Sequence, residues 1–209
     1  MGTVADTGTG TGAGGGPAVR RVALLRGINV GRGARIAMAD LAACTEAVGC
    51  ADVRTVLATG NVLLTDARPE PELRDALEAA YAERFGYDAV VQVLALDALD
   101  DAVAAYPFES LADHHDYLVF SDDPSVTARV AEAMAAAVDP AVGPATSARE
   151  PVTGGDTEAV AAGPGCVYWR VAKGSTLSSA AGKVLDARAN KRHLTTRNVR
   201  TLRKVLAAG

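Results

Sequence analysis

Cysteines and long apolar runs are scarce in this sequence of 209 residues, and their scarcity excludes several classes of protein. The three cysteines, Cys44, Cys50 and Cys166, are odd in number and widely spaced, which is not the pattern of a disulfide framework. No run approaches the roughly 18 uncharged apolar residues that a membrane span requires. Residues 1–17 lack the charged and apolar regions of a secretory signal. We therefore expect a cytoplasmic protein with no membrane partner.

Aromatic residues are also few, at 4% of the chain, whereas apolar residues make up 49% and charged residues 22%. This apolar share is enough for a packed core and excludes a disordered chain. At about 150 residues per domain, the length allows one large domain or two small ones. Few aromatics accompany the basic residues, so the sequence gives little support to stacking of RNA bases on a sheet.

Charge is distributed unevenly along the chain, although the formal net charge is only -4. Residues 1–35 carry a net charge of +4, residues 36–169 of -17 and residues 170–209 of +9. This separation predicts distinct basic and acidic surfaces, and the basic one suits an anionic small molecule or a nucleic acid. Basic helix faces are also often simply solvated.

The first half of the chain has the pattern strand, helix, strand, strand, helix, strand over residues 20–94. The predicted strands are 20–26, 52–57, 62–65 and 89–94, and the predicted helices begin near Met38 and Pro69. This order is the split βαβ, or ferredoxin-like, arrangement. Its right-handed crossover should place the loop over residues 27–33 beside the turn over residues 59–61, at one end of the sheet.

The second half is also mixed α and β. We predict a connector helix over residues 96–105, a strand over 116–120, a helix from Val126 to Val138, a three-strand meander over 145–153, 158–162 and 166–172, and helices over 178–190 and 197–207. The fold class is therefore α+β, with two ferredoxin-like plait domains, the second irregular with a three-strand meander and C-terminal helices. The predicted division is a disordered leader over 1–18, a first domain over 19–95, a connector helix and linker over 96–115, and a second domain over 116–209.

Two loops are candidates for binding an anion. The loop from Gly27 to Gly33 joins a strand to a helix, where backbone N–H groups can hold a phosphate, although its spacing matches no nucleotide motif. Its glycines are equally explained by a long turn with positive φ angles, and the turn over residues 59–61 has the chemistry of a tight hairpin. The expected meeting of the two loops makes them a candidate site.

The predicted final helix divides its residues between an apolar face and a basic face, the latter carrying Arg197, Arg200, Arg203 and Lys204. Thr195 or Thr196 is its expected N-cap. The predicted ligand-binding residues, chosen for guanidinium, amide, hydroxyl or exposed backbone groups, are Arg26, Gly27, Asn29, Gly31, Arg32, Arg35, Thr59, Asn61, Arg197 and Asn198.

Signatures of catalysis and of metal binding are weak. Residues 113–116, Asp-His-His-Asp, could ligate a metal, but adjacent residues point in different directions and a site needs three or four convergent ligands. No nucleophile or zinc-protease motif is present. We therefore predict no metal and no cofactor, and assign no catalytic residue.

Three segments together resemble one bacterial family. They are Leu24-Leu25-Arg26-Gly27-Ile28-Asn29-Val30-Gly31, Thr59-Gly60-Asn61-Val62, and Thr195-Thr196-Arg197-Asn198 followed by Thr201. They resemble the LRGINVGG, SGNV and TTRNxxT patterns of the family known as domain of unknown function 1697, over residues 19–206. The resemblance implies a two-domain α+β architecture of ferredoxin-like plaits. It implies no reaction, because the family is functionally unassigned.

The leading hypothesis is a protein that binds an anionic, phosphate-bearing ligand at the edge formed by the two loops. One alternative is a small-molecule enzyme that uses the same pocket through electrostatic stabilisation. Another is a protein-interaction or self-association module, because a basic helix can dock on an acidic surface. The oligomeric state is left open.

Overall fold

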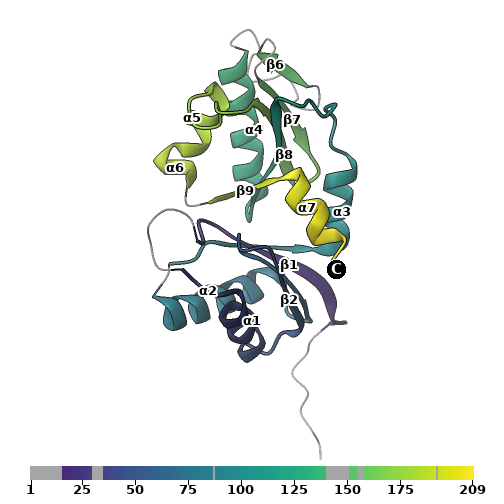
Figure 1. Cartoon of the computed structure of the whole chain (residues 1–209), viewed down its shortest axis with the longest axis vertical. Helices are drawn as coiled ribbons and strands as arrows, with labels where there is room; N and C mark the ends of the chain where they lie inside the picture. Colours follow the sequence, from purple (N-terminus) through teal and green to yellow (C-terminus); the bar gives the residue numbers. More distant parts are fainter. Residues whose placement is uncertain (1–15, 30–34, 87, 140–150, 155–157, 192) are drawn as a thin grey trace, which may run out of the picture.

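Two antiparallel β-sheets form the framework of the computed structural model, which describes residues 16–29, 35–86, 88–139, 151–154, 158–191 and 193–209 (Figure 1). The first sheet has the order β2-β3-β1-β4 and the second has the order β6-β7-β8-β5-β9. The strands are β1 (Val19–Leu25), β2 (Ala51–Val56), β3 (Asn61–Asp66), β4 (Val91–Ala95), β5 (His114–Ser121), β6 (Val152–Gly154), β7 (Glu158–Gly163), β8 (Cys166–Ala172) and β9 (Leu194–Asn198). The mixed α+β class is confirmed.

Seven helices accompany the sheets in the described residues. They are α1 (Met38–Ala47), α2 (Glu70–Phe85), α3 (Leu96–Ala104), α4 (Pro124–Val138), α5 (Ala180–Asp186), α6 (Arg188–Lys191) and α7 (Val199–Leu206). The strand and helix order expected over residues 20–94 is present as β1-α1-β2-β3-α2-β4. The same order of strands recurs in the second sheet, where β7-β8-β5-β9 corresponds to β2-β3-β1-β4 and β6 is added at the edge.

Each sheet buries its outer face under helices of its own half. Helices α1 and α2 cover the first sheet, with Leu41, Leu77 and Tyr81 in the buried cluster. Helices α4 and α5 cover the second sheet, where Met134 and Trp169 are buried. Both arrangements follow from apolar residues recurring at helical spacing opposite a buried strand face.

The inner faces of the two sheets share one core with α3 and α7, which lie at the junction of the two halves in Figure 1. The first sheet contributes Val22 and Leu24, the second contributes Phe120 and Tyr168, and α7 contributes Leu202. The Tyr168 hydroxyl also donates to the Ala102 carbonyl at 2.8 Å. Helix α7 therefore joins the halves as well as ending the described chain.

Three predictions about the C-terminal helices are wrong. The helix expected over residues 178–190 is interrupted at Ala187, whose backbone is extended (φ -56, ψ 136), and is split into α5 and α6. The final helix begins at Val199 rather than at Arg197, because β-branched threonines favour a strand and the Thr-Thr-Arg segment pairs with β5. Its N-cap is Asn198, which accepts the Arg200 N–H at 2.9 Å, and not Thr195 or Thr196.

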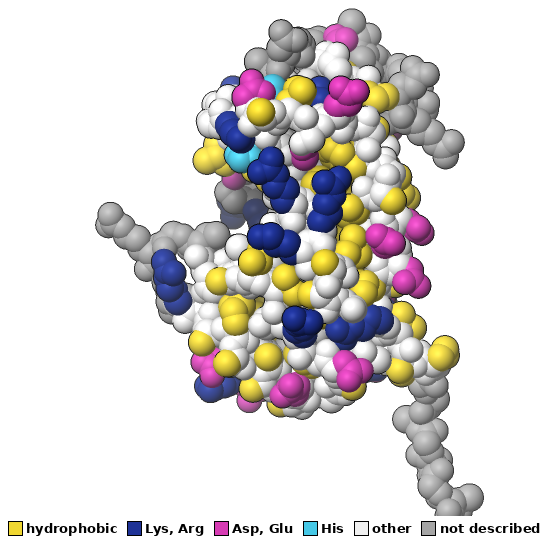
Figure 2. Space-filling view, turned by 45° about the vertical axis from the view of Figure 1, so that its right-hand side comes forward, with side chains coloured by type: hydrophobic (Ala, Val, Ile, Leu, Met, Phe, Trp, Pro, Cys, Tyr) yellow, Lys and Arg dark blue, Asp and Glu magenta, His cyan; other side chains and the backbone are white. Residues whose placement is uncertain are grey.

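This later start separates Arg197 from the basic face of α7. Arg200, Arg203 and Lys204 are exposed on α7, whereas Arg197 is only 9% exposed on β9. In Figure 2, Lys and Arg side chains gather over the middle of the face that contains α7.

The meander expected in the second half is present, since β6, β7 and β8 pair in succession. Residues 145–150 of its first predicted strand lie outside the described residues, as do residues 1–15 of the predicted leader. In the part of the chain that the structure describes, no helix combines the length and apolar character needed to cross a bilayer.

A charged pair closes the end of β3. Asp66 accepts three hydrogen bonds from Arg68, from its backbone N–H at 2.8 Å, from Nε at 2.9 Å and from Nη2 at 2.5 Å. The hydrogen bond from the Arg68 side chain is the main reason that the pKa of Asp66 is lowered to about 2. Cys50 lies beside this pair, and burial raises the pKa of its thiol to about 11. The thiol is therefore neutral at pH 7.

We expect Leu202→Ala to lower the free energy of unfolding by about 2–5 kcal/mol, because Leu202 is fully buried between the two sheets. Arg203→Ala, on the exposed face of the same helix, should change it by no more than about 0.5 kcal/mol. Urea unfolding measures both. Similar losses for the two variants would contradict the position assigned to α7.

The Asp66–Arg68 pair should make stability depend on pH. A carboxyl whose pKa falls from 3.8 to about 2 on folding stabilises the fold above pH 4, and this contribution disappears as the pH approaches 2. The stability difference between the wild type and Asp66→Asn should therefore shrink by about 2 kcal/mol between pH 6 and pH 2. Urea titrations across this pH range measure it, and a constant difference would contradict the pairing.

Candidate functional site

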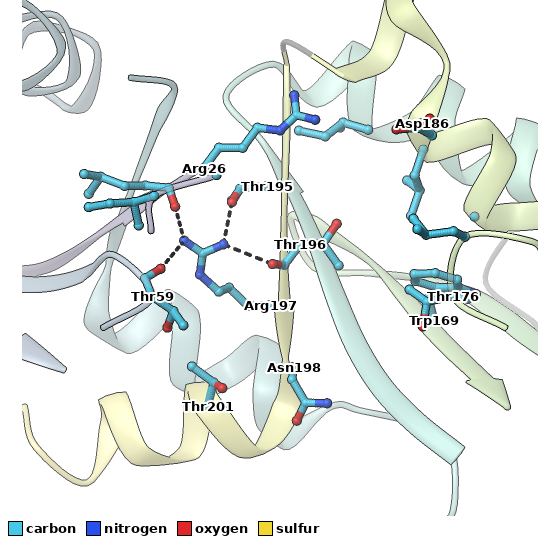
Figure 3. Close-up of a pocket in the computed structure, with 17 residues that line it drawn as sticks. Arg26, Thr59, Trp169, Thr176, Asp186, Thr195, Thr196, Arg197, Asn198 and Thr201 are labelled. Carbon is cyan, nitrogen blue, oxygen red and sulfur yellow. Dashed lines mark hydrogen bonds between the residues drawn. The ribbon is translucent and has the colours of Figure 1, made fainter. Parts of the chain in front are cut away.

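The guanidinium of Arg197 connects the three sequence motifs (Figure 3). Its Nε donates to Asn61 Oδ1 at 2.9 Å, and its Nη1 donates to Thr195 Oγ1 at 2.8 Å and to the Thr196 carbonyl at 3.0 Å. Its Nη2 donates to the Leu25 carbonyl and shares longer contacts with the carbonyls of Thr59, at 3.3 Å, and Gly60, at 3.4 Å. All five N–H groups are thus used inside the protein. Arg197 was predicted to hold an anion; in the structure its guanidinium binds acceptors of the first half and of its own strand β9.

The loops beneath Arg197 adopt left-handed backbone conformations. Gly27 and Gly60 have φ angles of 66° and 71°, and the non-glycine residues Asn29 and Leu57 have φ angles of 56° and 59°. A Cβ at Gly60 would overlap Ile28 Cγ2, so this position requires glycine. The two loops are neighbours, as the crossover predicts, and the Leu25 N–H donates to the Gly60 carbonyl at 2.7 Å.

The three predicted asparagines also serve the scaffold. Asn29 Oδ1 accepts the Ile36 N–H at 2.8 Å. Asn61 is fully buried, and its Nδ2 donates to the Val56 carbonyl at 2.8 Å. With Asn198 capping α7, these amides hold loops and a helix end in place, and Asn198 also lines the cavity described below.

The remaining predicted residues divide into three groups. Arg26, Gly27 and Thr59 line the cavity described next. Arg35 is exposed and lies outside its lining. Gly31 and Arg32 lie outside the described residues.

A cavity of about 580 Å³ opens between the two halves beside Arg197. Its lining comes from the end of β1, the hairpin turn, β8, β9, α5, the start of α7 and the segment before α5. The lining residues are Leu25, Arg26, Gly27, Ile28, Thr59, Trp169, Thr176, Leu177, Gly182, Leu185, Asp186, Leu194, Thr195, Thr196, Arg197, Asn198 and Thr201. All three motifs therefore contribute to one cavity.

One side of this cavity is rich in hydrogen-bond donors. The Thr59 hydroxyl accepts from Asn61 Nδ2 at 2.9 Å and the Thr195 hydroxyl accepts from Arg197, so each keeps its own proton for donation. The N–H groups of Gly27 and Ile28 donate to none of the described residues. The half-buried Arg26 adds a cation to the cavity lining, and in Figure 3 its side chain extends toward β9, away from Thr59.

The other side is mainly apolar, with Trp169, Leu177 and Leu185, and its one acid is Asp186. Leu177 is 79% exposed, which is unusual for a leucine. Trp169 is held by Glu158, whose Oε1 accepts the indole N–H at 2.7 Å and whose Oε2 accepts the Ala180 N–H at 3.1 Å. A buried carboxylate thus fixes both the indole and the start of α5.

Sequence reasoning missed this apolar side. Its residues are distant from the glycine loop in sequence, and they reach the cavity only because β9 brings α5 and β8 beside the end of β1. The one local signal was Leu177, an apolar residue within a segment of small and polar residues.

Comparisons with other proteins give a family and a fold. A family model described as "Protein of unknown function (DUF1697)" matches residues 19–145. Among solved structures, the conserved bacterial protein SP0830 from Streptococcus pneumoniae shares 22% sequence identity with a TM-score of 0.66, over 91% of this chain and 98% of its own. A likeness at that identity shows the fold alone. The search of curated proteins found no match.

Replacing Arg197 with lysine should lower the free energy of unfolding by about 3 kcal/mol or more, because one ammonium cannot replace the guanidinium and buried acceptors lose their donors. Arg200→Lys is the matched control and should change the free energy by less than about 0.5 kcal/mol. Chemical unfolding measures both. A loss below about 1 kcal/mol for Arg197→Lys would refute the structural role.

Proposed function

This chain belongs to the DUF1697 family of proteins of unknown function, and we propose that it binds a small anionic, phosphate-bearing ligand in the cavity between its two halves. The observation that carries this proposal is the number of donors in the cavity lining. Arg26, two threonine hydroxyls and two backbone N–H groups line one cavity, whose lining contributes no carboxylate except Asp186, on the α5 side.

Phosphate is the anion that best matches these donors. A guanidinium can donate two parallel hydrogen bonds to a phosphate or a carboxylate, and backbone N–H groups of a glycine loop add further donors. A phosphate has enough oxygens to accept from the guanidinium and the hydroxyls at once. In this proposal Arg26 carries the charge recognition, and Arg197 supports the site by holding the Thr195 hydroxyl.

The rest of the ligand should be apolar or aromatic. A volume of about 580 Å³ is within the usual range for small-molecule sites. Leu177 and Leu185 offer an apolar wall with the buried Trp169 behind them, and covering the exposed Leu177 would remove apolar surface from water. Asp186 can accept a hydrogen bond from an amine or hydroxyl at the far end of the ligand.

Binding rather than turnover is proposed. Among the described residues, the lining holds no histidine, cysteine or lysine, so the common nucleophiles and bases are limited to Asp186 and threonine hydroxyls.

We also interpret each half as a ferredoxin-like plait, which the strand orders β2-β3-β1-β4 and β7-β8-β5-β9 support. A cytoplasmic location is proposed as well, and three buried cysteines that are all free thiols support it.

Phenyl phosphate is a suitable first probe, because it joins a phosphate to an aromatic body. We expect it to bind more tightly than orthophosphate, and we expect phenol not to bind measurably. Arg26→Gln should weaken phenyl phosphate binding at least about tenfold, since a charged hydrogen bond contributes about 1.5–3 kcal/mol. Isothermal titration calorimetry measures all three ligands.

Arg129→Gln is the matched control, because it removes an exposed charge on α4 that is remote from the cavity lining. Thermal unfolding of each variant shows whether the fold is retained. Equal affinities in a folded Arg26→Gln variant and the wild type would exclude the cavity as the phosphate site.

A further inference from the structure

A second groove, of about 420 Å³, lies between α3 and α7 and shares no lining residue with the cavity between the halves. It is lined by Asp100, Val103, Ala104, Tyr106, Phe108, Ser110, Asp116, Val199, Arg200, Arg203 and Leu206. Basic and aromatic side chains therefore meet here from two segments that are far apart in sequence. Sequence reasoning found the basic residues but not the aromatic ones beside them.

One rim of the groove is basic. Arg200 and Arg203 belong to the exposed face of α7 and Lys204 is next to them, while Val199 and Leu202 on the opposite face are buried. These three cations form no ion pair with any residue that the structure describes, and α7 contains no acidic residue. Figure 2 shows dark-blue side chains over the middle of this face, with magenta side chains toward its right-hand margin. The rim therefore carries positive charge that no described carboxylate pairs with directly.

The opposite wall is aromatic and rigidly held. The rings of Tyr106 and Phe108 meet edge to face, with centroids 5.4 Å apart, and Tyr106 packs in the same way on Tyr168 at 5.5 Å. The Tyr106 hydroxyl donates to Asp116 Oδ1 at 2.7 Å. Arg170 Cζ lies 5.2 Å from the centroid of the Phe108 ring. Phe108 is nevertheless only half-buried, so part of its ring is available in the groove.

We propose that this groove binds single-stranded nucleic acid, with a base against Phe108 and neighbouring phosphates on Arg200 and Arg203. Cations without an ion pair beside a partly exposed aromatic ring fit the alternation of phosphate and base along a single strand. A paired base does not offer its face, so a single strand fits this groove better than a duplex.

The acidic residues of the groove favour a nucleic acid over an acidic protein partner. Asp100 is exposed on α3, and Asp116 is engaged by Tyr106 and Ser110. Both carboxylates repel acidic side chains at the aromatic wall, whereas Asp100 can accept a hydrogen bond from the exocyclic amine of a base. Phosphates are therefore assigned to the α7 rim and the base to the opposite wall.

The test is fluorescence anisotropy of a labelled oligoadenylate over a series of salt concentrations. The double variant Arg200→Gln, Arg203→Gln should bind more weakly, and the slope of log K against log salt should be less steep by about 1.4, or about 0.7 for each phosphate that is no longer neutralised. Phe108→Leu keeps the apolar bulk of the side chain but removes the aromatic face, and should weaken binding about tenfold with an unchanged salt slope.

An abasic strand of the same length separates stacking from charge. The wild type should bind the abasic strand about tenfold more weakly than oligoadenylate, which is the affinity expected of Phe108→Leu for oligoadenylate. Phe108→Leu and the wild type should bind the abasic strand equally well, because this strand has no base to stack. The matched control is the double variant Lys183→Gln, Arg188→Gln, which also removes two positive charges but from exposed positions on α5 and α6. It should bind oligoadenylate almost as tightly as the wild type does.

Several results would overturn the proposal. These are no binding at low salt, equal weakening by the two double variants, or equal binding of the abasic strand and oligoadenylate. Competition by polyglutamate as effective as that by unlabelled oligoadenylate, with no effect of Phe108→Leu, would indicate a surface for acidic proteins. Thermal unfolding shows whether each variant is folded. Arg26→Gln should leave oligoadenylate binding unchanged, because Arg26 lines the other cavity and not this groove.

Discussion

A single buried guanidinium holds together the three segments on which the molecule depends. Arg197 leaves β9, reaches the first half and donates all its N–H groups to the end of β1, the hairpin turn and its own strand. Without it, several buried acceptors would lose their donors, and each loss costs about 1–3 kcal/mol. Gly60, whose carbonyl accepts from this guanidinium, and Gly27 beside it both have left-handed backbone conformations.

Basic residues that are adjacent in sequence have opposite roles because the backbone changes from strand to helix between them. Arg197 on β9 points into the junction of the halves, whereas Arg200 and Arg203 on α7 point to solvent. The change occurs at Asn198, whose amide caps α7. One short segment thereby supports a donor-rich cavity on one side and contributes the basic rim of a groove on another, so the two sites depend on the same strand-to-helix transition.

Local patterns were sufficient to predict most elements of the fold. The apolar periodicity of α1, α2 and α4, the turn glycines and the crossover rule together predicted that the glycine loop and the hairpin turn would meet, which they do. The predicted start of α7 was wrong. The amphipathic pattern extends back to Arg197, but residues 194–198 pair with β5, and this pairing decides where the helix begins. Trp169 and Phe108 could not be assigned to sites from sequence, because long-range packing alone brings them to their cavities.

The contacts that join the halves also connect residues made at very different times during synthesis. Arg197 is separated by 172 residues from Leu25 and by 136 residues from Asn61. Each sheet has most of its pairings within its own half, but β9, α7 and the guanidinium that closes the junction emerge from the ribosome after the rest of both sheets. Closing such long loops is slow relative to local structure formation. The nascent chain is therefore expected to carry a first half whose inner face is covered only in part, by α3, until α7 has been made, and this partly open face favours aggregation.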